Sequence, residues 1–270
     1  MAGNMAAILI AQPTTGHVVS GTVGYLMNLT VALQKKGIQY SYRQTALSDI
    51  ALSRNIFASM VHADSSVSHL LFIDSDMGFL PESILGLLDF DQPVTAIACP
   101  KRHLAWERLR SAAEGEALAG RTGDERRATS TLMDLCLDFN VDLKRFDGSD
   151  WTAERQGNFL KVPAVGTGIM LIRREALEAM VLKGVAIPRA GYSGLPLIGD
   201  APLYDFFSPI ETPDRTLVES EDISFCKRWV EDCGGEIWVD IVSRVLHLGM
   251  RGHSGRYLPK AMQDFPETAE

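Results

Sequence analysis

The sequence predicts an α/β fold in which a mixed but mostly parallel, Rossmann-like central sheet is flanked by helices. Short apolar runs that end at glycine, proline or polar residues recur through the first hundred residues, as is typical of buried strands. Between them lie segments with apolar side chains at helical spacing. Strands that alternate with helices in this way favour a parallel sheet. The 270 residues suffice for one large domain.

The first half of the chain contains four predicted strands and three predicted helices. The strands are expected at residues 7–11, 39–43, 69–73 and 94–98. The first helix is expected to end at Gly37. Its apolar positions are Val23, Leu26, Leu29, Val31 and Leu33. The second helix is expected at 51–62, and Pro81 opens the third in the favoured first helical position.

The second half is less regular. Residues 104–157 are charged and alanine-rich, and we expect them to form a variable helical insert packed outside the sheet. An apolar strand is predicted at 160–173, interrupted by Gly166-Thr167-Gly168, and a helix at 176–182. Residues 187–216 form a long loop, and a loop of this length is usually functional or disordered. Its aromatic residues favour a binding surface, and they are Tyr192, Tyr204, Phe206 and Phe207.

The C-terminal part is predicted to contain one more helix and one more strand. The helix begins at Ser220 and ends at Gly234-Gly235, and the strand covers 236–241. Residues 250–270 are polar and are predicted to be a flexible tail. The whole chain, residues 1–270, is therefore expected to be a single domain.

Composition and charge disfavour several classes of protein. The net charge is -8 and the isoelectric point is near 5.3, whereas a protein that grips a phosphate backbone is usually basic. No apolar run approaches the roughly 18 residues of a membrane span, and the opening residues lack the basic region of a signal peptide. The four cysteines form no CxxC pair and are expected to be reduced. We expect a cytoplasmic protein without integral membrane contact.

The strand expected at 69–73 runs directly into Asp74-Ser75-Asp76. Alternate residues on an extended chain point the same way, so the two carboxylates can converge just past the strand. Such a pair attracts a hard divalent cation, which keeps open positions for water or phosphate. The alternative is an acidic turn before the next helix, since an isolated Asp-x-Asp is common.

Two further polar groups follow at element ends, where open α/β sheets place their sites. Glu221 and Asp222 lie at the start of the predicted helix, although carboxylates there also simply complement the helix dipole. His247 ends an apolar segment and is either a satisfied structural residue or a ligand. If it folds back onto the aspartates, oxygen and imidazole ligands together suit Mn²⁺ or a similar ion.

The order of these segments resembles the GT-A family of nucleotide-sugar glycosyltransferases, of the family 2 type with a DxD motif. The matching segments are the first strand, Ser53-Arg54-Asn55, LFIDSDMGFLP at 71–81, VGTGIMLIRREAL at 165–177, ESEDISFCKRW at 219–229 and HLG at 247–249. The resemblance implies a GT-A fold. Residues 1–103 would be its nucleotide-sugar-binding half and residues 158–249 its acceptor and catalytic half.

The resemblance also implies roles for residues on the donor side. The implied contacts to the nucleotide sugar are Ala11, Gln12, Pro13, Arg54, Asp74, Ser75, Asp76, Lys101 and Gly168. The implied ligands of Mn²⁺ or Mg²⁺ are Asp74, Asp76 and His247. Some of these residues also fit roles that involve no ligand. Arg54 would then be a solvated residue at the edge of the apolar face of its helix, Lys101 would be a surface residue, and the glycines would allow tight packing of the strand.

Asp222, with Glu221 beside it, matches the acidic pair that activates the acceptor hydroxyl in inverting members, although this pair occurs in both stereochemical classes. The resemblance thus implies sugar transfer from a nucleotide donor, with UDP-sugars favoured over GDP-sugars. The acceptor hydroxyl could belong to a glycan, a lipid-linked sugar, a protein or a modified nucleobase. One alternative is a nucleotidyltransferase, which the absence of lysine and arginine from residues 12–17 disfavours. The other is a non-catalytic nucleotide-sugar-binding module.

Overall fold

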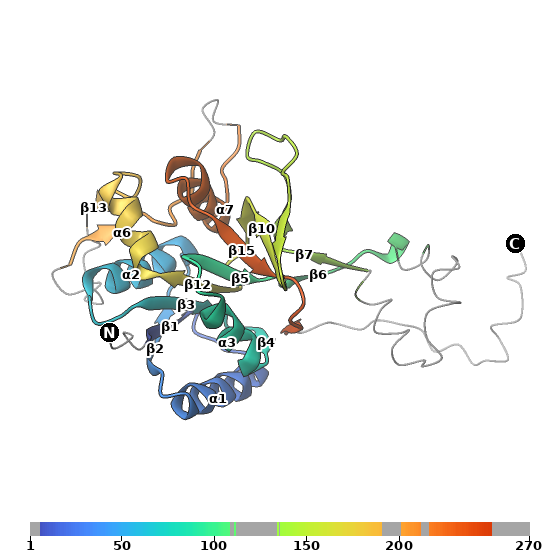
Figure 1. Ribbon diagram of the computed structural model, residues 1–270, viewed down its shortest axis with the longest axis horizontal. Helices are drawn as coiled ribbons and strands as arrows, with labels where there is room; N and C mark the ends of the chain where they lie inside the picture. Colours follow the sequence, from blue (N-terminus) through green and yellow to red (C-terminus); the bar gives the residue numbers. More distant parts are fainter. Residues whose placement is uncertain are drawn as a thin grey trace, which may run out of the picture.

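The computed structural model describes residues 6–108, 111, 134, 136–190, 201–211 and 216–249. An eight-stranded sheet forms its centre, with the strand order β2-β1-β3-β12-β5-β15-β10-β9 (Figure 1). These strands are β1 (Ala7–Thr14), β2 (Gln39–Ala46), β3 (His69–Ile73), β5 (Val94–Ile97), β9 (Glu154–Gln156), β10 (Phe159–Val162), β12 (Ile169–Arg173) and β15 (Ile237–Asp240). The tail predicted at 250–270 lies outside the described residues.

All strands of this sheet except β10 and β12 run in one direction. β1 pairs in parallel with β2 and β3, and β5 pairs in parallel with β15. β12 is antiparallel to both β3 and β5, and β10 is antiparallel to both β15 and β9. The sheet is therefore mixed but mostly parallel, as the alternation of strands and helices predicts.

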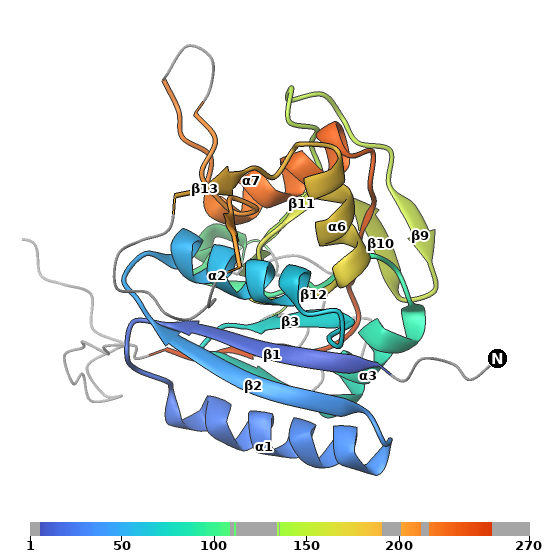
Figure 2. The ribbon, with the colours of Figure 1, turned by 90° about the vertical axis from the view of Figure 1, so that its left-hand side faces the viewer.

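Helices cover both faces of the sheet (Figure 2). On one face lie α1 (Ser20–Lys35) and α3 (Pro81–Phe90), and on the other lie α2 (Ile50–Ala63), α6 (Arg174–Leu182) and α7 (Glu221–Lys227), which continues into the π-helix η2 (Arg228–Asp232). Side chains alternate along a strand. Ile8 and Ile10 of β1 therefore pack in the hydrophobic core between the sheet and α1 and α3, and Leu9 and Ala11 pack in the core on the opposite face.

Most predicted elements are present, with shifts at their ends. β3 has the predicted bounds, and β1 runs on to Thr14. Gly37 follows α1 with a φ of 70°, a backbone conformation that favours glycine. In α1, Leu29 and Leu33 are fully buried, whereas Val23 is 46% exposed and lies outside the buried stripe.

The apolar stretch at 160–173 is not one strand. Pro163 and Gly166–Gly168 divide it into β10, β11 (Ala164–Val165) and β12, which occupy three different places. β10 lies beside β15, β12 lies between β3 and β5, and β11 pairs with β8 (Val141–Asp142). Because β12 is antiparallel to β3, the start of β12 lies at the edge where β3 ends.

The segment expected to be a helical insert contains short strands as well as helical residues where it is described. β6 (Pro100–Leu104) pairs with β7 (Leu137–Phe139), and β8 and β9 follow before residue 157. Residues 109–110, 112–133 and 135 lie outside the described residues. Residues 106–108, 111, 134 and 136 are helical, so the helical insert stays a prediction for the rest of the segment.

The described aromatic residues of the long loop, Tyr204, Phe206 and Phe207, are buried or half-buried and pack in the core. Phe206 and Phe207 are fully buried, and the Phe207 ring stacks on Phe225 with centroids 4.4 Å apart. Tyr204 belongs to β14 (Leu203–Tyr204), which pairs with β13 (Pro188–Arg189). Tyr192 lies outside the described residues.

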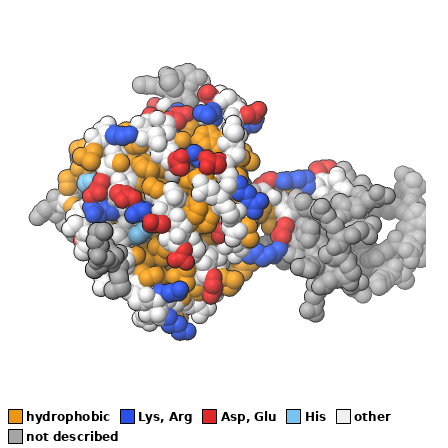
Figure 3. Space-filling view, viewed as in Figure 1, with side chains coloured by type: hydrophobic (Ala, Val, Ile, Leu, Met, Phe, Trp, Pro, Cys, Tyr) orange, Lys and Arg blue, Asp and Glu red, His pale blue; other side chains and the backbone are white. Residues whose placement is uncertain are grey.

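On the face in Figure 3, acidic and basic side chains are interspersed among hydrophobic ones. The four cysteines are buried and unpaired. None of the helices in the described ranges is long and apolar enough to cross a membrane.

Gly235 offers a test of the packing. A Cβ built on Gly235 would lie 2.0 Å from Cε2 of Trp229, whose indole nitrogen donates to the Glu236 carbonyl at 2.9 Å. We expect Gly235→Ala to lower the free energy of unfolding by about 1–3 kcal/mol, because overpacking forces the indole to move. Urea unfolding measures this as a lower midpoint. Gly86→Ala is the control, since a Cβ there meets nothing within 4 Å; equal losses in both variants would contradict the packing argument.

Candidate active site

The candidate site lies at the edge of the sheet where the parallel strands end. β1, β3 and β5 all end there, and β12 starts there because Ile169 pairs with Ile73. The Gly168 carbonyl accepts a hydrogen bond from the Asp74 amide at 2.9 Å. The Asp-x-Asp segment and the glycine turn, far apart in the sequence, are therefore neighbours at the edge where open α/β sheets bind ligands.

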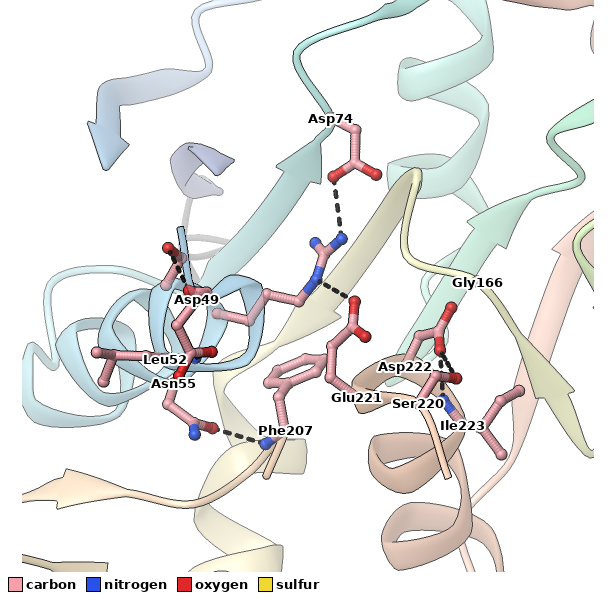
Figure 4. Close-up of polar contacts among 12 residues, drawn as sticks. Asp49, Leu52, Asn55, Asp74, Gly166, Phe207, Ser220, Glu221, Asp222 and Ile223 are labelled. Carbon is pink, nitrogen blue, oxygen red and sulfur yellow. Dashed lines mark hydrogen bonds and ion pairs between the residues drawn. The ribbon is translucent and has the colours of Figure 1, made fainter. Parts of the chain in front are cut away.

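Arg54, on α2, links Asp74 at the end of β3 to Glu221 at the start of α7, and Figure 4 labels these two carboxylates. Its Nη2 lies 3.0 Å from Oδ1 of Asp74, and its Nε lies 3.4 Å from Oε1 of Glu221. The guanidinium carbon is 5.1 Å from the centroid of the Phe72 ring. Arg54 is only 2% exposed, so it is not a solvated residue at the edge of a helix stripe. Its Nη1 is buried with no hydrogen-bond partner, which leaves one buried donor free for a bound molecule.

Acidic groups outnumber the cation around Asp74. Burial raises the pKa of Asp74, the Arg54 guanidinium opposes that rise, and the nearby carboxylates of Glu221 and Asp222 raise the pKa further. One guanidinium thus faces three carboxyl groups. The balance of charge at this edge favours an additional cation.

Asp222 has one carboxylate oxygen engaged by its own helix and one directed away from it. Its Oδ1 accepts hydrogen bonds from the Ser220 hydroxyl and, at 2.9 Å, from the Ile223 amide. Its Oδ2 would be 3.1 Å from a Cβ built on Gly166. Figure 4 shows Glu221 and Asp222 projecting from the start of α7, with Asp222 beside Gly166. Glu221 contacts Arg54, whereas Asp222 packs against Gly166, a close approach that a residue without a Cβ allows.

His247 folds back onto Asp76, the arrangement that a role as a metal ligand requires. β16 (Val245–His247) pairs with β4 (Met77–Phe79), so that His247 is opposite Met77. Nε2 of His247 lies 3.4 Å from Oδ2 of Asp76. Nδ1 of His247 lies 2.8 Å from the Pro100 carbonyl, which can only accept, so we assign the proton to Nδ1. Nε2 then carries a lone pair, which lies near Asp76 and accepts from Nε of Arg102 at 2.9 Å.

This arrangement fits a divalent cation at Asp76 and His247. A carboxylate oxygen and an imidazole nitrogen face each other, and the second ring nitrogen is fixed by a carbonyl, as is usual for metal-binding histidines. Asp74 is engaged by Arg54, and the described ranges contain no group of three or more His, Cys, Asp or Glu side chains arranged to hold a metal. The role of Asp74 as a third ligand stays a prediction.

Asn140 belongs to the site, although no sequence motif pointed to it. Its Nδ2 donates to the Gly166 carbonyl at 3.2 Å, and its Oδ1 accepts from the Cys99 amide at 2.8 Å. The Gly166 amide donates to the Asn140 carbonyl at 2.8 Å. Asn140 thus fixes the backbone beside Asp222 from within the segment 104–157, and only the folded chain brings it there.

The residues expected to line a nucleobase pocket are enclosed by the sheet. Ala11 and Gln12 are fully buried, and Pro13 is buried as well. Oε1 of Gln12 accepts from the Tyr42 hydroxyl at 2.7 Å and from Nε2 of Gln44 at 2.8 Å, whereas its own Nε2 is buried without a partner. Gln12 therefore holds a second free buried donor at the end of β1.

The other predicted donor contacts lie around the same edge. The Ser75 carbonyl accepts from the Val19 amide at 2.9 Å, which ties the start of α1 to the Asp-x-Asp segment. Lys101 is exposed. Gly168 is closely packed, since a Cβ there would be 3.2 Å from the sulfur of Cys99.

No protein-family model and no curated protein matches the chain. Among solved structures it is similar to A197 from STIV, with a TM-score of 0.45 and 15% identity, over 95% of this chain and 100% of that one. A glycosyltransferase involved in glycosylation of the major capsid of PBCV-1 has a TM-score of 0.31 and 10% identity, over 66% and 65%. A Drosophila β-1,4-galactosyltransferase 7 mutant, in complex with manganese, UDP-Gal and xylobiose, has a TM-score of 0.37 and 11% identity, over 97% and 82%. Identities this low say nothing about chemistry.

Proposed function

We propose that this protein is a metal-dependent glycosyltransferase of the GT-A fold that moves a sugar from a nucleotide-diphosphate donor to an acceptor hydroxyl. One observation carries the proposal: the Asp76–His247 pair, Asp222 and the bridging Arg54 all meet at the carboxyl edge of one mostly parallel sheet. They come from four distant segments, and each suits a different part of such a reaction.

The donor half of the reaction belongs to Asp76, His247 and Arg54. Asp76 and His247 would hold Mn²⁺ or Mg²⁺, with Asp74 as the further ligand. A bound divalent cation neutralises charge on the leaving diphosphate. Arg54 offers its unpaired buried Nη1 to the nucleotide, and the residues around Gln12 bind the nucleobase. We favour a UDP-sugar as the donor.

The acceptor half belongs to Asp222. The hydrogen bonds from Ser220 and Ile223 use its Oδ1, so Oδ2 is the oxygen that we assign to the acceptor hydroxyl. A carboxylate there takes the hydroxyl proton as the new bond forms. Glu221 is held by Arg54 and acts as a positioning residue. We therefore propose an inverting reaction with Asp222 as base, in the cytoplasm, on a glycan, lipid-linked sugar, protein or modified nucleobase.

Thermal stabilisation by nucleotides tests this proposal directly. We expect one of UDP, GDP or CMP, or its sugar, to raise the melting temperature only when Mn²⁺ is present. A ligand at 100 times its Kd adds about 2.7 kcal/mol of stability, which is several degrees for a chain of this size. Asp76→Ala should abolish the metal-dependent part of the shift. No shift with any nucleotide would overturn the proposal.

The released product separates sugar transfer from nucleotidyl transfer. A glycosyltransferase releases a nucleoside diphosphate from the nucleotide sugar, whereas a nucleotidyltransferase releases pyrophosphate from a nucleoside triphosphate. We expect slow release of the nucleoside diphosphate from the bound donor, with water as the acceptor. Pyrophosphate release instead would favour the second class.

A further inference from the structure

Arg102 occupies the space between Asp76 and His247. It comes from β6, and its Nη2 forms an ion pair with Oδ2 of Asp76. Its Nε donates to Nε2 of His247 at 2.9 Å. The side chain lies along Gly249, where a Cβ would be 3.4 Å from Cδ of Arg102. A single guanidinium thus contacts both atoms that the proposed function assigns to the metal.

The two contacts with Arg102 use the electron pairs that a metal needs. The Pro100 carbonyl fixes the proton of His247 on Nδ1, so Nε2 can interact with a cation only through its lone pair. That lone pair now accepts from Arg102, and the facing oxygen of Asp76 is paired with the same guanidinium. Metal and guanidinium cannot share these atoms, so binding of one requires departure of the other.

The burial of the three side chains indicates which of them can move. The Arg102 side chain is 56% exposed, whereas those of Asp76 and His247 are 15% and 23% exposed. The ligands are therefore fixed by their surroundings, and the guanidinium is free to leave toward solvent. Exposed ion pairs contribute little net stability, so its departure is inexpensive.

We propose that Arg102 is an internal counter-cation, which holds Asp76 and His247 in place in the metal-free protein and is displaced when the metal binds. This inference rests on the proposed function, because it concerns the same metal site. It predicts that Arg102 lowers the affinity of the site for metal and keeps Asp76 and His247 ordered when no metal is bound.

Calorimetric titration of Mn²⁺ into the nucleotide-free protein tests the inference. We expect Arg102→Ala to bind Mn²⁺ about tenfold more tightly than the wild type, which corresponds to about 1.4 kcal/mol. Arg102→Gln, which keeps length and hydrogen bonding without the charge, should behave like Arg102→Ala. Lys101→Ala removes the same charge from the adjacent exposed residue, and we expect it to change Mn²⁺ affinity less than twofold.

Melting temperatures give a second readout. Without metal, Arg102→Ala should melt below the wild type because Asp76 and His247 lose the cation between them, and saturating Mn²⁺ should remove the difference. Equal Mn²⁺ affinity in the wild type and Arg102→Ala would overturn this inference and leave the proposed function intact, as would weaker binding by Arg102→Ala. A gain in Lys101→Ala equal to that in Arg102→Ala would overturn it too, since charge alone would then explain the effect. Failure of every variant to bind Mn²⁺, with and without nucleotide, would overturn both.

Discussion

Replacing Asp222 by Asn is expected to slow sugar transfer by about 10²–10⁴-fold, the usual contribution of a positioned general base. The amide cannot take a proton from the acceptor hydroxyl. The start of α7 should be unaffected, because Oδ1 of asparagine can still accept from the Ser220 hydroxyl and the Ile223 amide. Nucleotide binding should be retained, since Asp222 is not one of the proposed metal ligands, which are Asp74, Asp76 and His247.

The measurement is kcat and KM for the donor, with nucleotide binding followed separately by thermal shift. Glu221→Gln is the matched variant, since the amide oxygen can still accept from Nε of Arg54. We expect a smaller loss of kcat in Glu221→Gln than in Asp222→Asn. Full transfer activity in Asp222→Asn would show that the base is misassigned, and a larger loss in Glu221→Gln would identify Glu221 as the base.

The sequence predicted the sheet well where local signals were strong. The strand at 69–73 is bounded by polar residues on both sides and has no helical periodicity, so its limits could be read directly. The place and direction of β12 could not be predicted. They depend on pairing with β3 and β5, which lie about 70 to 100 residues earlier in the chain, and the residue pattern of a strand does not specify its neighbours.

The candidate site could be predicted only in part, for a similar reason. Asp74 and Asp76 follow a strand directly, so local sequence indicates them. Arg54 is held by Glu221 of α7, which is 167 positions away, and the position of Asn140 depends on a hairpin whose partners are distant in sequence. The pairing of Arg102 with His247 joins residues that are 145 positions apart. Such contacts carry no periodicity that a single sequence could reveal.

Arg54→Met is expected to cause the largest loss of stability in the site. Methionine retains much of the length and can still contact the Phe72 ring. It leaves Asp74 and Glu221 without the cation that bridges them. Breaking a buried pair by removing one partner costs about 3–5 kcal/mol. The Asp74 side chain is 29% exposed and that of Glu221 is 18% exposed, so we expect the lower end of that range, about 3 kcal/mol, by urea unfolding at neutral pH.

The pH dependence distinguishes this electrostatic cause from lost packing. The pKa of Asp74 is already raised by burial, and Arg54 opposes that rise, so the pKa should be higher still in Arg54→Met. A carboxyl group whose pKa is higher in the folded than in the unfolded state binds more protons when folded, so stability falls as pH rises. The deficit of Arg54→Met should therefore be greatest at neutral pH and shrink toward pH 4. Adding Glu221→Gln should restore part of the loss, since it removes one of the two unpaired charges. A deficit that is independent of pH and unchanged in the double variant would mean that Arg54 acts by packing alone.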